Sequence, residues 1–77
     1  MNNFELDVRR LMCPMPVIRA QDRVMELNPG DRLTVICTDP GAKHDIPAWC
    51  RINGHTVDTL LEENDEIKII ITVGNNG

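Results

Sequence analysis

Hydrophobic and polar residues alternate at the beginning of the chain, where charged side chains separate Phe4, Leu6 and Val8. A period of two is typical of a strand with one buried face. The same kind of pattern recurs in three later segments. The predicted strands span residues 4–8, 32–38, 56–62 and 66–73. Their predicted core-facing residues include Leu33, Val35 and Cys37 in the second strand and Ile67, Ile69, Ile71 and Val73 in the last.

The segment between the first two strands has helical spacing instead. From residue 14 to residue 27, apolar residues recur at positions that include Val17, Ala20 and Val24, with polar residues between them. This spacing places the apolar residues on one helix face. The Asn-Pro-Gly-Asp sequence of residues 28–31 is typical of a turn, so we expect it to end the helix.

A second helix is predicted over residues 43–53. Gly54 follows it and is a residue type that often ends helices. Because proline has no N–H to donate, we place Pro47 in the first turn of this helix. The acidic residues 62–66 contain the turn between the last two strands, and His55 is interpreted as a turn residue.

The order β-α-β-α-β-β predicts an α/β (α+β) two-layer sandwich, in which two helices cover one face of a mixed four-stranded sheet. A right-handed crossover makes the first two strands parallel, so their carboxyl ends lie at one edge. The loop that contains Cys13 and the loop of residues 38–44 should therefore share a surface. We expect a single domain over residues 1–77, with residues 74–77 as a flexible tail.

Composition narrows the classes of function. The formal net charge is −4, and the chain has one Trp, one Phe and no Tyr, whereas nucleic-acid binding favours basic surfaces and aromatic residues. The first residues lack the basic start and the apolar stretch that are typical of a signal peptide. The apolar segment 67–73 is too short to span a bilayer. We therefore expect a cytoplasmic protein, most simply a monomer, with no direct contact to nucleic acid or membrane.

Three widely spaced cysteines do not form a disulfide framework, and an odd number leaves at least one thiol free. Free thiols fit a reducing compartment. We assign Cys37 and Cys50 to core packing, because Cys37 lies on an apolar strand face and Cys50 accompanies Ile46 and Trp49 on a helix. Ligands drawn from the cysteines and histidines would need wide and irregular spacings, so we predict no metal site.

The sequence Cys13-Pro14-Met15-Pro16 lies where the first helix begins. Proline is favoured in the first helical turn, and the positive end of a helix lowers the pKa of a nearby thiol. We therefore predict that Cys13 is the working nucleophile, that Pro14 and Pro16 stiffen its loop, and that its pKa is depressed. The alternative is that Cys13 is a small buried hydrophobic residue.

The type of thiol chemistry follows from what surrounds Cys13. Disulfide exchange typically uses C-x-x-C, but Pro16 occupies the position of the second cysteine. A cysteine hydrolase would need an oriented histidine, and although His44 could lie nearby, a chain of 77 residues leaves little room for a substrate cleft. The remaining role is a single nucleophile that accepts a group and passes it on. Sulfane sulfur held as a transient persulfide on Cys13 is the natural cargo, and no other cofactor is implied.

Charged residues around this surface are candidates for docking or for electrostatic support of the thiolate. Asp39 is first of all expected to cap its own loop, since Asp-Pro sequences favour such turns. Lys43 and His44 are expected to be solvated. Arg19 and Arg23, four residues apart on one helix face, could bind an acidic partner. The full set of candidates is Arg9, Arg10, Arg19, Arg23, Asp39, Lys43 and His44.

Several of these blocks together resemble the TusA/SirA family of small sulfur carriers over nearly the whole chain. The resemblance is carried by Leu6-Asp7-Val8-Arg9, Cys13-Pro14-Met15-Pro16, Asp39-Pro40, Asp45-Ile46-Pro47, Trp49-Cys50 and Gly54-His55. It implies a two-layer β-α-β-α-β-β fold similar to the C-terminal domain of translation initiation factor 3. It also implies that Cys13 acts as a sulfurtransferase site that accepts persulfide sulfur and hands it to a cysteine of another protein.

The resemblance further implies the kinds of partner. A cysteine desulfurase or another persulfide donor would load the protein, and a DsrE/TusD-like protein would accept the sulfur. Such relays serve tRNA 2-thiouridine synthesis, sulfur oxidation or molybdenum-cofactor pathways. Arg10 and Met12 depart from the family, which commonly has glycine and a polar or basic residue at these positions, and both lie on the expected docking surface.

Two other classes of function remain to be weighed. A regulatory or RNA- or protein-binding module of the SirA type would not depend on Cys13, but the acidic charge and scarce aromatic residues disfavour RNA. A ubiquitin-like thiocarboxylate carrier would need a C-terminal Gly-Gly, whereas this sequence ends in Asn75-Asn76-Gly77.

Overall fold

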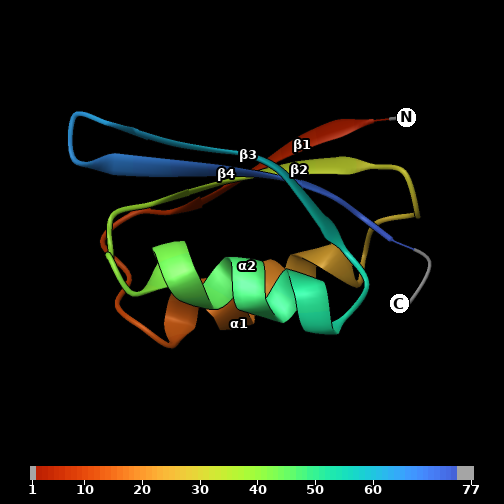
Figure 1. Cartoon of the computed structure of the whole chain (residues 1–77), viewed down its shortest axis with the longest axis horizontal. Helices are drawn as coiled ribbons and strands as arrows, with labels where there is room; N and C mark the ends of the chain where they lie inside the picture. The colour runs from red at the N-terminus through yellow and green to blue at the C-terminus, as the bar shows by residue number, and fades with distance from the viewer. Residues whose placement is uncertain (1, 75–77) are drawn as a thin grey trace.

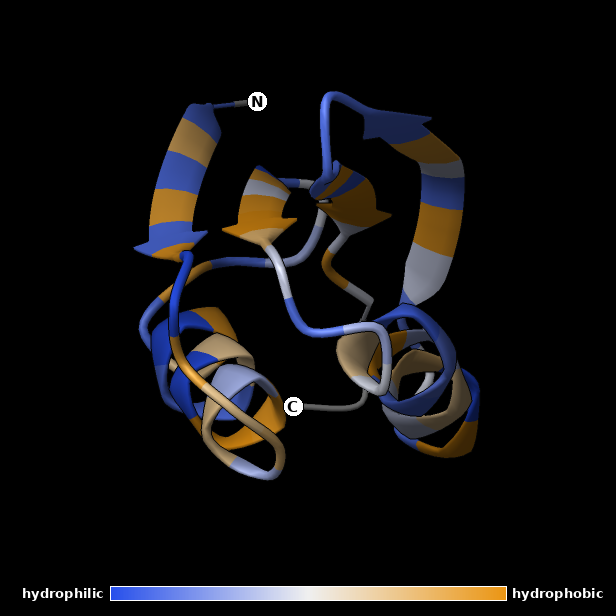
Figure 2. Cartoon of the chain, turned by 90° about the vertical axis from the view of Figure 1, so that its left-hand side faces the viewer, coloured by the Kyte–Doolittle hydropathy of each residue, from blue (hydrophilic) through white to orange (hydrophobic). Residues whose placement is uncertain are grey.

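The structure is a computed structural model that describes residues 2–74. The strands β1 (Asn3–Val8) and β2 (Arg32–Cys37) pair in parallel, with Val8 opposite Cys37. The helix α1 (Met15–Val24) connects them. Because the two strands run in the same direction, the loops that follow Val8 and Cys37 leave the sheet at the same edge (Figure 2). This arrangement confirms the predicted parallel pairing of the first two strands.

The second half of the chain completes the sheet. The helix α2 (Ala42–Ile52) leads into the antiparallel hairpin of β3 (Thr56–Glu63) and β4 (Glu66–Thr72). The sheet order is β1-β2-β4-β3, so β4 lies between β2 and β3. Both helices cover the same face of the sheet (Figure 1). The predicted two-layer α+β sandwich with a mixed sheet is therefore confirmed.

The core lies between the sheet and the two helices. The central strands contribute most of its buried residues, in agreement with the predicted alternation. The edge strands β1 and β3 are otherwise only partly buried or exposed, but Val8 of β1 is fully buried. Ala20 and Val24 of α1 and Ile46 and Cys50 of α2 close the core from the helix side. From the central strands the buried residues are Leu33, Val35, Cys37, Ile67, Ile69 and Ile71.

The end of α1 and the start of α2 differ from the predicted boundaries. α1 ends at Val24, and the N–H of Leu27 donates to the carbonyl of Val24, so residues 25–27 form tighter turns beyond the helix. Pro47 was expected in the first turn of α2, which is wrong. The helix begins at Ala42, so Pro47 lies inside it. The helix loses one backbone hydrogen bond at Pro47. The core packing of the adjacent Ile46, which is fully buried, offsets this loss.

Two further details concern the turns and the end of the chain. The β3–β4 hairpin turns through Asn64 and Asp65, both with positive φ, which matches the preferred geometry of a two-residue hairpin. The N–H of Gly74 donates to Nδ1 of His55 at 2.9 Å, so the first residue of the expected tail is held in place. Residues 75–77 lie outside the described residues. Among residues 2–74, no helix has both the length and the apolar character needed to cross a membrane.

Candidate functional site

Cys13 lies in the loop between β1 and α1, and its side chain is exposed. Two features fix this loop. Pro16 is buried in the first turn of α1, and the N–H of Met15 donates to the carbonyl of Met12 at 2.9 Å. The alternative reading of Cys13 as a buried hydrophobic residue is therefore wrong. The thiol is presented to solvent by a loop whose two ends are anchored in the sheet and in the helix.

Two carboxylates from the second half of the chain bind Cys13. Oδ2 of Asp39, in the loop after β2, accepts the N–H of Cys13 at 3.0 Å. Oδ2 of Asp45, in α2, accepts a hydrogen bond from the Cys13 thiol, with 3.1 Å between Sγ and the oxygen. The predicted meeting of the two loops is thus confirmed. Asp39 caps the Cys13 loop through its side chain, while its carbonyl accepts the N–H of Ala42.

The prediction that the Cys13 pKa is depressed is wrong, because the pKa of the thiol is raised. The hydrogen bond to Asp45 is the largest cause, followed by partial desolvation and by the negative charges of Asp45 and Asp39. Backbone N–H groups that could stabilise a thiolate are also scarce in this turn. Pro14 and Pro16 have no N–H, and that of Met15 is bonded to Met12. Two nearby carboxylates therefore outweigh the start of α1.

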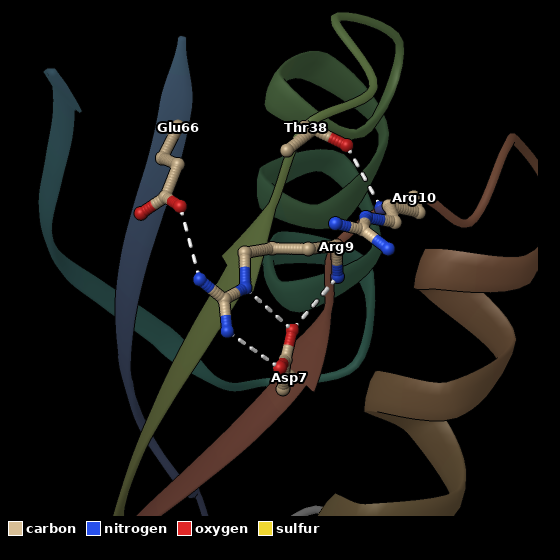
Figure 3. Close-up of polar contacts among 5 residues, drawn as sticks. All are labelled: Asp7, Arg9, Arg10, Thr38 and Glu66. Carbon is tan, nitrogen blue, oxygen red and sulfur yellow. Dashed lines mark hydrogen bonds and ion pairs between the residues drawn. The ribbon is translucent and has the colours of Figure 1, made fainter. Parts of the chain in front are cut away.

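The two loops are packed closely against each other. A Cβ at Gly41 would lie 3.2 Å from Oδ2 of Asp39 and 3.7 Å from Cβ of Cys13, so a larger residue would crowd the Asp39 carboxylate and be in van der Waals contact with Cys13. The N–H of Arg10 donates to Oγ1 of Thr38 at 2.9 Å, which ties the two loops together a second time (Figure 3). The geometry around the thiol therefore depends on contacts between segments more than 25 residues apart.

Arg9 does not supply charge to Cys13. Its guanidinium binds Asp7 at 2.9 Å and Glu66 of β4 at 3.0 Å, across the ends of the sheet strands (Figure 3). The side-chain hydrogen bond from Arg9 lowers the pKa of Asp7 to about 2, and these bonds raise the pKa of Arg9. Arg9 is thus engaged in a surface network with two acids. Arg10 adopts a positive φ of 71°, which is unfavourable for a residue other than glycine.

The remaining candidates are divided between two surfaces. Lys43 forms an ion pair with Glu62 of β3, and with exposed His44 it lines a cleft of about 490 Å³ between the start of α2 and the β3–β4 hairpin. On α1, the guanidinium of Arg23 pairs with Glu26 and lies 4.9 Å from the ring centre of Phe4, whereas Arg19 is exposed. Arg19 and Arg23 therefore do not form an evenly exposed basic stripe, because Arg23 is held against β1.

The other two thiols are enclosed in the core, as predicted. Cys37 and Cys50 have no exposed surface. Burial raises the pKa of Cys37, and it raises the pKa of Cys50 to about 11. The Cys37 thiol donates to the carbonyl of Ile67. Neither side chain can meet a partner protein without local opening of the fold.

Sequence reasoning did not single out Asp45 as a site residue. Asp45 was noted only as part of the Asp-Ile-Pro block, and the available signal was an acidic residue near the start of a helix predicted to approach the Cys13 loop. The structure places Cys13, Asp39 and Asp45 together. In residues 2–74, no three His, Cys, Asp or Glu side chains are grouped in a way that could hold a metal ion.

Comparison with known proteins now identifies the family. Residues 4–73 match the family described as sulfurtransferase TusA. The chain belongs to the TusA family. It is 43% identical over 61 residues to the sulfur carrier protein TusA of Pseudomonas aeruginosa, covering 79% of this chain and 73% of that protein. It is 41% identical over 69 residues to YrkI, a proposed sulfur carrier of Bacillus subtilis, covering 90% and 92% of the two chains.

A solved structure shows the same fold. The SirA-like protein from Desulfitobacterium hafniense superimposes with a TM-score of 0.82 at 24% identity, covering 94% of this chain and 99% of that one. At this level of identity the likeness concerns the fold alone. The sulfur-carrier role of the TusA family comes from the sequence relatives, and it directs attention to the exposed thiol at the edge of the sheet.

Proposed function

We propose that Cys13 is the sulfur-carrying residue, and that it accepts sulfane sulfur as a persulfide and passes it to a cysteine of a partner protein. The observation that carries this proposal is the contrast among the three cysteines. Cys13 is exposed on a loop, whereas Cys37 and Cys50 are buried. A carrier that exchanges sulfur with other proteins needs a thiol that they can reach, and Cys13 alone meets this need.

The transfer requires no cofactor. The sulfur of Cys13 attacks the outer sulfur of a donor persulfide, a new S–S bond forms on Cys13, and the donor's S–S bond breaks. The electron pair leaves on the donor sulfur, which takes up the proton released by Cys13. One thiol and one persulfide go in and one of each comes out, so the exchange has no net oxidation. Transfer to the acceptor repeats the same steps with Cys13 as the donor.

The proposed partners are proteins of complementary chemistry. A cysteine desulfurase or another protein persulfide would load Cys13, and a DsrE/TusD-like protein would accept the sulfur. The pathway served would be tRNA 2-thiouridine synthesis, sulfur oxidation or cofactor synthesis, and the setting would be the cytoplasm. The small size of the chain, 77 residues, fits brief docking of a monomer with each partner in turn.

The test is the intact mass of the protein after incubation with a polysulfide, or with cysteine and a cysteine desulfurase. Wild type should gain the mass of one sulfur atom, and a reducing agent should remove it. Cys13→Ser should gain none. Cys50→Ala is the matched control, and it should load like wild type, because Cys50 is enclosed in the core.

Two results would contradict the proposal. Equal loading of wild type and Cys13→Ser would show that another group carries the sulfur. No loading of wild type from any donor would favour a regulatory role that does not use the thiol.

A further inference from the structure

We propose that Asp45 keeps Cys13 in its protonated form while the carrier is free, and that a sulfur donor releases the thiol by placing a cationic group beside Asp45. The inference rests on the proposed role of Cys13 as sulfur carrier. It assigns a gating role to a residue of α2 and a charge to the surface of the donor.

The first argument is the contact itself. The Cys13 thiol donates to Oδ2 of Asp45 at 3.1 Å, across 32 residues of sequence. Asp45 is held by the fold, because its N–H donates to the carbonyl of Gly41 at 3.0 Å and Ile46 beside it is fully buried. Cys13 is held as well, because its N–H donates to Asp39. The hydrogen bond to the sulfur therefore joins two anchored segments.

The second argument is the sign of the surrounding charge. The charged groups that act on the sulfur are Asp45 from α2 and Asp39 from the loop after β2, and both are negative. Arg9 binds Asp7 and Glu66, and Lys43 binds Glu62. A carboxylate accepts a hydrogen bond from a thiol and repels a thiolate. The same contact therefore stabilises the protonated form and opposes the nucleophilic one, and the pKa of Cys13 is raised.

The third argument is exposure. Cys13, unlike the other thiols, faces solvent, so without a gate it would be open to oxidation and to reaction with any electrophile. Asp45 is also exposed, so a partner can reach it. A lysine or arginine of the donor that binds Asp45 would compete with the Cys13 thiol for its carboxylate and would neutralise its negative charge. The Cys13 proton could then leave as the sulfur attacks the donor persulfide, in the balanced exchange described above.

The test measures Cys13 directly and needs no sulfur donor. The rate of iodoacetamide alkylation of Cys13 is followed from neutral to alkaline pH, and peptide mass mapping identifies the labelled thiol. In folded wild type, the pH midpoint of the rise in the Cys13 alkylation rate should lie above the midpoint for the same chain unfolded in urea. In Asp45→Asn the midpoint should fall, and alkylation near pH 7.5 should become about fivefold faster, the size expected for one nearby charge in water.

The matched control is Asp22→Asn, which removes the same charge from an exposed position on α1. It should leave the midpoint unchanged. An Asp45→Asn midpoint equal to wild type, or an equal shift in Asp22→Asn, would overturn the gate. If Asp45→Asn did not fold, wild type would still decide, because a folded midpoint at or below the unfolded one would also overturn it.

The cationic release is tested with charged thiol reagents. Wild-type Cys13 should react faster with a cationic methanethiosulfonate than with an anionic one, and Asp45→Asn should lose most of this preference. Equal rates for the two reagents in wild type would overturn the requirement for a cationic donor. Sulfur loading by polysulfide is a separate measurement. The proposed role of Asp45 can therefore be overturned while the carrier role of Cys13 stands, and the carrier role can be overturned while the effect of Asp45 on the thiol stands.

Discussion

Each end of α2 lies beside a cysteine, but one of these cysteines is exposed and the other is buried. At the first end, Asp45 meets the exposed Cys13 thiol, and both side chains are open to solvent. At the last end, Cys50 is fully buried, and the ring of Trp49 stacks on His55 with 5.0 Å between ring centres. The N–H of His55 donates to the carbonyl of Cys50, which closes that end of the helix.

The difference shows that burial and partners, and not the residue type, decide what a side chain can do. His55 is 7% exposed, and its Nδ1 accepts the N–H of Gly74. Desolvation lowers its pKa, so the neutral ring that this bond requires is favoured. The prediction that His55 serves as a turn residue therefore understates its packing role. At that end the hydrogen bonds of His55 lie in a buried part of the fold, whereas the hydrogen bond between Cys13 and Asp45 is exposed to a partner.

The largest expected difference between the two ends is in thiol reactivity. Iodoacetamide at pH 8 should label Cys13 in the folded protein at least about a hundredfold faster than Cys50, because Cys50 is buried and its pKa is about 11. Mass mapping over time gives both rates in one sample. Unfolding in urea is the control and should bring the rates close together. Similar rates in the folded protein would mean that the α2 C-terminal end opens readily.

A smaller effect is expected from Trp49→Ala. Trp49 is partly buried, stacks on His55 and lines a cavity of about 320 Å³, so its removal should lower the free energy of unfolding by about 2 kcal/mol. Urea unfolding measures the loss. The alkylation rate of Cys13 in the folded variant should stay at the wild-type value. A changed Cys13 rate would show that the two ends of α2 are coupled.

The smallest effect is expected at Arg10, beside the Cys13 loop. A φ of 71° destabilises the folded state of an L-residue by roughly 1–2 kcal/mol. Glycine removes this strain, but its greater flexibility in the unfolded chain offsets part of the gain. Arg10→Gly should therefore raise the free energy of unfolding by about 0.5 to 1 kcal/mol. Asn64→Gly is the matched control at φ 53°, and it should gain less, since asparagine tolerates this region. A less stable Arg10→Gly would mean that the arginine side chain makes contacts worth more than the strain.

Much of the fold could be predicted from local patterns. The alternation in β2 and β4 identified their buried residues correctly, because a strand with one face against a core can place apolar residues at every second position only. The parallel pairing of β1 and β2 followed from the short helix between them. The position of Pro47 could not be predicted in the same way. The core contact of Ile46 outweighs the local preference that places proline in a first turn.

At the site, the sequence by itself determined which thiol is presented. Cys13 lies between a strand and a helix-starting proline, and that local order places it in a loop at the sheet edge. Only the tertiary structure decided the state of the thiol. Asp39 and Asp45 reach Cys13 from 26 and 32 residues away, and their charges reverse the effect expected of the helix start. Electrostatic interactions depend on distance in space, which a linear sequence does not contain.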